Sequence, residues 1–311
     1  MNHSVVLLSL LSSLALAACG DDTATGGGAQ GGGSSDGGSS DGGNGPTAGS
    51  SQGGSGEGGG ANAQWTTLVT GDWSLPPGGE ITSDLHTVEL DHDIFVGAIR
   101  PISPQGTHHT VLAIGSFQAG NILYASGVDT NALEFPPGVG LRLRAGDDIV
   151  LQLHVFNPSQ EAISGTSGIE VVEIAPEDVE QEADIFLPGP FNLQIPPNQT
   201  STKTGTCLIE AEQNVFAVFP HMHQLGSHFK TTLTVGGVSS VLHDGDYDFN
   251  HQAFIPFDPI ALSPGDTITT ECTWNNTTSQ TIGWGESSTT EMCFSIMYRY
   301  PAQDDAGFCG Q

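Results

Sequence analysis

The chain has 311 residues, and its 35 acidic residues outnumber its 6 lysines and arginines, so the formal net charge is −29 at pH 7. So negative a chain repels phosphate groups, which argues against nucleic acid and anionic lipid as partners. The length is sufficient for one or two domains. No apolar run beyond the N-terminus is long enough for a transmembrane helix.

The N-terminus has the pattern of a lipoprotein signal peptide over residues 1–19. An apolar run over residues 5–17 leads into Ala17-Ala18-Cys19, the small-residue pattern that precedes a lipid-modified cysteine. We therefore expect lipidation at Cys19, export, and membrane contact through the lipid anchor only, on the periplasmic side or the outer surface. An uncleaved anchor and a plain secretory signal are the alternatives.

Residues 20–64 are a low-complexity stretch of Gly, Ser, Asp, Asn, Thr and Ala with almost no apolar side chains. Such a stretch cannot bury enough surface to offset the entropy that it would lose on folding. We expect a disordered Gly/Ser/Asp linker that tethers a folded part, residues 65–311.

The folded part shows few helix signals and many short runs rich in Val, Ile, Thr and Phe, separated by Pro, Gly, Asn and Asp. These runs cover residues 85–90, 94–99, 110–117, 149–156, 168–174, 208–219, 229–235, 267–274 and 292–300. They predict an all-β sandwich or barrel. A proline-rich stretch at residues 176–197 places a domain boundary between residues 65–180 and 181–311, and each part is long enough for one β-sandwich.

Four cysteines besides Cys19 all lie in the C-terminal half, at Cys207, Cys272, Cys293 and Cys309. An even number in an exported chain predicts two disulfides, and the sequence leaves three pairings open. No two of the four form a CxxC pair, which argues against a structural zinc site.

Histidines occur at two places in the N-terminal half. His108 and His109 precede an apolar strand, and Gln152 and His154 share one face of another strand. Neighbours in a strand point to opposite faces, so His108 and His109 could bind one metal only at a strand end or bulge, which the preceding residues 104–106 permit. Taken singly, the pair would be a surface loop and His154 a buried core histidine.

The C-terminal half carries His221 and His223, which share one face of a predicted strand, as a metal site needs. A third ligand is offered by Met292, whose thioether suits Cu(I) and suits zinc poorly. Core packing is the ordinary role of a methionine. The neighbouring Cys293 would fix the backbone there if it is disulfide-bonded.

Taken in order, these motifs resemble the copper type II ascorbate-dependent monooxygenases, the family of peptidylglycine α-hydroxylating and dopamine β-monooxygenases. The motifs are His108-His109, Gln152-x-His154, His221-x-His223 and Glu291-Met292-Cys293. The resemblance implies two consecutive antiparallel β-sandwich domains of jelly-roll type, each with one copper. It implies Cys207–Cys309 and Cys272–Cys293 as the disulfides.

The resemblance also assigns roles to the candidate ligands. It implies that His108, His109 and His154 hold an electron-transfer copper, and that His221, His223 and Met292 hold the catalytic copper. Gln152 matches a supporting glutamine. The implied function is hydroxylation of a C–H bond in a small organic substrate by a monomer that uses O2, two copper ions and ascorbate or a similar one-electron donor.

The sequence departs from the peptide-hydroxylating members at the substrate. Phe219 stands where those enzymes carry an arginine for the substrate carboxylate, and residues 293–297 lack their tyrosine. A peptide ending in glycine is therefore not expected as substrate. The other histidines of the folded part match no ligand position and are interpreted as surface or supporting residues: His86, His92, His228, His243 and His251.

Two alternatives remain open from the sequence. One is a non-catalytic periplasmic copper-binding or electron-transfer lipoprotein on the same fold. The other is a β-sandwich binding module whose histidines hold zinc or nothing. Met292 argues against zinc, and the paired histidine motifs argue against a plain binding module.

Overall fold

The computed structural model describes residues 64–310 except 118–120, 129, 286, 288 and 304–306. The predicted signal peptide, the lipidation site Cys19 and the predicted linker lie outside the described residues. Among the described residues there is no α-helix, which confirms the all-β class, and no helix there is long and apolar enough to cross a membrane.

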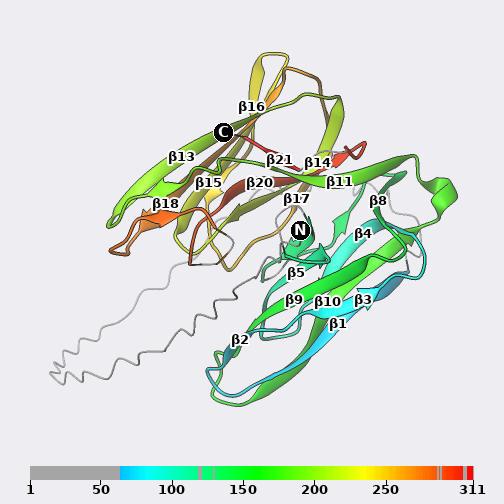
Figure 1. Cartoon of the computed structure of the whole chain (residues 1–311), viewed down its shortest axis with the longest axis vertical. Helices are drawn as coiled ribbons and strands as arrows, with labels where there is room; N and C mark the ends of the chain where they lie inside the picture. The colour runs from blue at the N-terminus through cyan, green and yellow to red at the C-terminus, as the bar shows by residue number, and fades with distance from the viewer. Residues whose placement is uncertain are drawn as a thin grey trace, which may run out of the picture. The chain divides into compact units, whose positions relative to one another are not determined.

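The strands of the N-terminal half range from 2 to 12 residues and pair antiparallel with most of their neighbours (Figure 1). They are β1 (Trp65–Leu75), β2 (Glu80–Thr82), β3 (His86–Glu89), β4 (Ile94–Ile102), β5 (Thr107–Ile114), β6 (Ile122–Ser126), β7 (Leu133–Glu134), β8 (Val139–Leu143), β9 (Asp148–Phe156) and β10 (Ile163–Ile174). A 3-10 turn, η2 (Pro176–Asp178), follows them.

The C-terminal half continues in the same manner. Its strands are β11 (Gln181–Pro188), β12 (Gln194–Ile195), β13 (Gln199–Leu208), β14 (Gln213–Met222), β15 (Gly226–Val235), β16 (Val238–Asp246), β17 (Ile255–Leu262), β18 (Thr267–Asn276), β19 (Ile282–Gly283), β20 (Cys293–Tyr300) and β21 (Phe308–Cys309).

Each half contains two layers of strands that enclose apolar side chains. In the N-terminal half, a sheet of order β2-β9-β5-β6 faces strands β1-β10-β4-β8, and in the C-terminal half the sheet β13-β18-β15-β16 faces β11-β20-β14-β17. This arrangement is that of β-sandwiches. It follows from alternation: in β9, Ile149, Leu151 and Leu153 are fully buried, while Gln152 and His154 on the opposite face are half-buried.

The strands β1-β10-β4-β8 and β11-β20-β14-β17 are joined into one continuous sheet. The joint is β11, which pairs in parallel with β8 through Gln181 and Val139, and antiparallel with β20 through Phe186 and Met297. One cluster of buried apolar residues also contains side chains from both halves, among them Leu153 and Phe219. The division into domains at residues 180 and 181 stays a prediction.

The described residues contain two disulfides, Cys207–Cys309 and Cys272–Cys293. Of the three pairings that the cysteine count leaves open, this is the one that the family resemblance implies. The second bond joins β18 to the first residue of β20, and so ties the two sheets of the C-terminal half together beside Met292.

Candidate metal centres

The first candidate centre lies where β5 and β9 pair. His109 is opposite His154, and the register shifts between Thr107 and His109. Just before it, a turn closes from Thr107 N to Pro104 O, with Gly106 at φ 103°, a conformation that favours glycine. This irregularity is the kind of break in alternation that the sequence permits here, and it lets both His108 and His109 approach His154.

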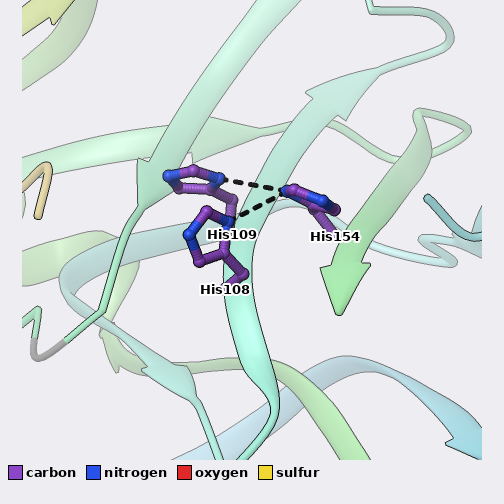
Figure 2. Close-up of side chains that lie close together, drawn as sticks. All are labelled: His108, His109 and His154. Carbon is purple, nitrogen blue, oxygen red and sulfur yellow. Dashed lines mark hydrogen bonds between the residues drawn. The ribbon is translucent and has the colours of Figure 1, made fainter. Parts of the chain in front are cut away.

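The three imidazoles meet through the same ring nitrogen. The Nδ1 atom of His154 is 3.0 Å from Nδ1 of His108 and 3.4 Å from Nδ1 of His109 (Figure 2). The three residues each offer a ligand atom, and these atoms lie within 4.8 Å of one another. The spacing is that of ligands around a shared ion.

The hydrogen-bond partners of the three Nε2 atoms determine which ring nitrogen of each histidine carries the proton. His108 Nε2 is 2.6 Å from Asn250 Oδ1, His109 Nε2 is 2.9 Å from the Phe249 carbonyl, and His154 Nε2 is 2.6 Å from Glu80 Oε1. All three partners are acceptors, so each Nε2 carries the proton and each Nδ1 presents a lone pair.

Three lone pairs that converge within this distance repel one another unless a cation lies between them. The residues therefore fit a metal ion, and three imidazoles suit copper among other transition metals. Burial lowers the pKa of His109 to about 4, and burial likewise lowers the pKa of His108, so both rings stay neutral at pH 7 and able to bind.

The second candidate centre lies at the end of β14. The rings of His221 and His223 are 5.2 Å apart between centroids, and both rings line a cavity together with Met292. His221 Nδ1 donates to Gln252 Oε1 at 2.9 Å, and His223 Nδ1 donates to the Thr290 carbonyl at 2.9 Å. In both rings Nε2 is therefore the nitrogen left with a lone pair.

The two centres thus present different nitrogens, Nδ1 in the first and Nε2 in the second. Burial lowers the pKa of His221 to about 3, and burial also lowers the pKa of His223. Two neutral imidazoles and a thioether form a soft ligand set that favours Cu(I).

Glu291 holds the backbone around the second centre. Its carboxylate accepts hydrogen bonds from His223 N, Leu225 N and Trp274 Nε1 at 2.9, 2.8 and 2.9 Å. The residue has no exposed surface, and this burial raises its pKa. Glu291 therefore fixes the path of the chain at His223 and just after it, and it directly precedes Met292.

Both centres open onto one cavity of about 500 Å³. His109, Gln152 and His154 line it from the N-terminal half, and His221, His223 and Met292 from the C-terminal half. Apolar side chains form much of the remaining wall, including Val111, Ile122, Phe219, Phe294 and Ile296. None of the described lining residues is a lysine or arginine, and Glu80 is the acid among them.

Sequence reasoning missed most of the residues that orient the ligands: Glu80, Phe249, Asn250, Gln252 and Thr290. No local signal could identify them, because each meets its histidine across a long chain separation, 142 residues for the contact of His108 with Asn250. The histidines outside both centres lie against other groups: His92, His228 and His251 pair with Asp91, Asp244 and Asp248, and His86 packs on Gly71.

Comparison with known proteins agrees with this geometry. Residues 181–311 match the family model described as copper type II ascorbate-dependent monooxygenase, C-terminal domain. DBH-like monooxygenase protein 1 of Mus musculus is 30% identical over 204 residues, which is 58% of this chain and 33% of that protein. The human protein of the same name has the same identity and coverage.

A more distant relative is tyramine beta-hydroxylase of Caenorhabditis briggsae, 22% identical over 207 residues, 59% of this chain and 34% of that protein. The chain spans about a third of the length of these curated relatives. Residues 181–311 therefore belong to the C-terminal domain of the copper type II ascorbate-dependent monooxygenase family, and these relatives support the same family for the chain.

Proposed function

We propose that this protein is an exported copper-dependent monooxygenase that hydroxylates a C–H bond of a small organic substrate with O2 and ascorbate or a similar one-electron donor. The observation that carries the proposal is that two differently built ligand sets face one apolar cavity. One set presents three imidazole nitrogens, and the other presents two imidazoles and a thioether. A carrier for a single metal does not need this pairing.

The ligand sets suit different roles. His108, His109 and His154 would hold a copper that passes an electron, since imidazoles accommodate both oxidation states. His221, His223 and Met292 would hold the copper at which oxygen is activated. Bound there, copper would supply the one-electron redox chemistry and the activation of oxygen that characterise the family.

The protein itself orients the ligand rings and excludes water from part of the cavity. The Gln252 amide and the Thr290 carbonyl fix the Nδ1 protons of His221 and His223, so that Nε2 stays free. Gln152 lies in the cavity wall beside His154 and supports the first centre. The buried rings of Phe219 and Phe294 exclude water where the substrate would lie.

The cavity also indicates the class of substrate. A carboxylate buried there would have no lysine or arginine among the described lining residues to pair with, which is costly. The Phe219 ring lies 6.0 Å from that of His221, and by the family resemblance this position is that of the carboxylate-binding arginine. We infer a substrate that is uncharged or cationic near the reacting carbon and apolar around it.

Other features of the chain support a location outside the cytoplasm. The disulfides Cys207–Cys309 and Cys272–Cys293 are typical of chains that fold in an oxidising compartment. We propose a monomer anchored through Cys19 to the periplasmic side or outer surface of a membrane.

Copper loading followed by metal analysis tests the two-centre proposal. We expect two copper ions per chain, and one each in Met292→Ile and His154→Ala. Ascorbate-driven oxygen uptake should depend on an added neutral or cationic substrate and should vanish in Met292→Ile. The matched control is Met297→Ile, because Met297 is fully buried in a different apolar cluster and lines neither centre.

Three results would count against the proposal. Fewer than two copper ions in the native chain would remove the two-centre assignment. Uptake that survives in Met292→Ile would remove the oxygen-activating role of Met292. Two bound coppers without substrate-dependent uptake would instead indicate a copper-binding or electron-transfer lipoprotein.

A further inference from the structure

One loop of the C-terminal half contacts both candidate centres. It is the segment of residues 247–254 between β16 and β17, here called the bridge segment. Asn250 Oδ1 and the Phe249 carbonyl accept from Nε2 of His108 and His109, at the first centre. Gln252 Oε1 accepts from Nδ1 of His221, at the second.

These contacts form an unbroken hydrogen-bonded path between a ligand of each centre. His109 Nε2 donates to the Phe249 carbonyl, Gln252 Nε2 donates to the same carbonyl at 2.9 Å, and Gln252 Oε1 accepts from His221 Nδ1. Gln252 is 5% exposed, so water does not replace these bonds.

The path works in only one arrangement of protons. If Nε2 of His221 carried the proton, Nδ1 would need a donor, and the Gln252 amide would have to turn over. Its oxygen would then face the Phe249 carbonyl oxygen, and one of the two would lose its partner. A metal on Nε2 of His221 therefore favours the amide orientation that keeps the Phe249 carbonyl in place for His109.

The same dependence holds from the first centre. A metal on Nδ1 of His109 fixes the proton on Nε2, and that proton holds the Phe249 carbonyl. The carbonyl in turn orients the Gln252 amide with its oxygen toward His221. Each metal thus stabilises the proton arrangement that the other centre requires.

Further hydrogen bonds hold the bridge segment in place at Tyr247 and at the carbonyl of Gln252. The Tyr247 hydroxyl accepts from Met222 N at 3.0 Å and donates to Met222 O at 2.6 Å, between the two ligand histidines of the second centre. From the N-terminal half, Gly127 N donates to Gln252 O at 2.8 Å, and Thr130 Oγ1 donates to the same oxygen at 2.9 Å.

The amide of Asn250 is fixed independently. Asn250 Nδ2 donates to Asp248 Oδ1 at 3.1 Å, which leaves Oδ1 of Asn250 facing His108. The Phe249 ring lies 4.9 Å from the ring of His109 and 6.5 Å from that of His223. The segment therefore approaches ligands of both centres with its backbone and its side chains.

We propose that Gln252 is a positioning residue that couples copper binding at the two centres, so that filling one raises the affinity of the other. The inference rests on the proposed function only in needing two copper sites. It adds that the sites are not independent and names the amide that links them. The expected coupling is about fivefold or more in affinity, within the usual range for linked sites.

The test measures copper dissociation constants by competition with a chelator. His154→Ala and Met292→Ile leave one intact centre each and give the two single-site constants. The native chain gives the stepwise constants, and the comparison gives the coupling factor. Linkage requires the same factor whichever centre is filled first.

Gln252→Met keeps the size of the side chain and removes both hydrogen bonds. We expect the second centre to lose about 10- to 100-fold in affinity, as is usual when a supporting hydrogen bond is removed, and the coupling factor to fall to about one. The matched control is Gln280→Met, since the Gln280 side chain is exposed. It should leave the constants and the coupling factor unchanged.

Amide hydrogen exchange gives a second readout that does not depend on turnover. Copper added to Met292→Ile, where only the first centre is intact, should slow exchange at the amide of Met222, which donates to Tyr247 in the bridge segment. The slowing should disappear when Gln252→Met is added.

A native chain that binds two coppers with no coupling would overturn this inference and leave the proposed function standing. Coupling of unchanged size in Gln252→Met would overturn the role of Gln252. A native chain that binds fewer than two coppers would overturn the proposed function first.

Discussion

Each ligand histidine has one nitrogen bound to an oxygen acceptor, and this choice decides which nitrogen faces the metal. The acceptors are a glutamate, an asparagine, a glutamine and two backbone carbonyls. A ring whose proton is held in this way loses little freedom when it binds a metal. The chemistry of the two centres is therefore set as much by these oxygens as by the ligands.

Glu291 is the residue whose change should most disturb the second centre without removing a ligand. In Glu291→Gln, an NH2 group must face either Leu225 N or the pair formed by His223 N and Trp274 Nε1. A buried donor left without an acceptor costs about 1–3 kcal/mol. Urea unfolding of the metal-free chain should show a loss of about 2–3 kcal/mol.

The control for this prediction is Glu210→Gln, because Glu210 is exposed. That change should alter the free energy of unfolding by less than about 0.5 kcal/mol. Equal stability of Glu291→Gln and the native chain would show that these backbone contacts contribute little.

Two partly buried ligand histidines predict a pH dependence of the metal-free chain. Burial lowers the pKa of His109 to about 4 and that of His221 to about 3, whereas an unfolded histidine titrates near 6.5. Between these values the unfolded chain binds more protons, so the free energy of unfolding should rise as the pH is raised from about 4 to about 6.5.

The slope should reach about 1.4 kcal/mol per pH unit for each such histidine. Denaturant titrations across this pH range measure it. The double variant His109→Asn, His221→Asn should lose this part of the slope, because neither asparagine titrates. A double variant with the native slope would mean that other groups cause the dependence.

At the scale of the elements, the irregular pairing of β5 and the disulfide at the start of β20 both position candidate metal ligands. The register shift before His109 brings two consecutive histidines to one metal. The Cys272–Cys293 bond holds the start of β20, directly after Met292, against β18. The register shift and the disulfide each hold a ligand-bearing part of the backbone in a position that regular strand pairing alone would not give.

The two disulfides should therefore differ in what they stabilise. Replacing Cys207 and Cys309 by alanine opens a loop with a sequence separation of 102 and should cost about 5 kcal/mol. Replacing Cys272 and Cys293 opens a separation of 21 and should cost about 3 kcal/mol. Thermal or urea unfolding of each double variant measures these losses.

For copper affinity we expect the reverse, with the larger effect from the loss of the Cys272–Cys293 disulfide. Loss of Cys272–Cys293 should weaken the centre that contains Met292 and leave the first centre unchanged, whereas loss of Cys207–Cys309 should affect neither. Each variant thus serves as the control for the other. Equal effects on the second centre would mean that the neighbouring disulfide has no special part in placing Met292.

At the scale of the whole molecule, the two halves share a sheet and an apolar core. β11 pairs with β8 on one side and β20 on the other, and Leu153 and Phe219 belong to the same buried cluster. Shared burial couples the unfolding of one half to that of the other.

We therefore expect the metal-free chain to unfold in one transition. Scanning calorimetry should give a calorimetric enthalpy equal to the van't Hoff enthalpy. Two resolved transitions would instead show that residues 65–180 and 181–311 are independent domains, as the sequence predicts, and that β11 couples them weakly.

The sequence by itself determined the all-β class, because that class rests on local patterns, whereas the full set of candidate ligands came from the family resemblance. Alternation along a strand places His221 beside His223 and Gln152 beside His154, and the soft thioether of Met292 indicates copper. The cysteine count predicted two disulfides and left their pairing open, and the family resemblance supplied the pairing that the structure contains.

Only the tertiary structure decided which nitrogen of each histidine is free, and which cavity the centres share. These properties depend on Glu80, Phe249, Asn250 and Gln252, which no periodicity connects to the histidines. A hydrogen bond between residues 142 positions apart, such as His108 with Asn250, exists only after the sheets have packed. The bridge segment therefore has no signature in the sequence, although it contacts both centres.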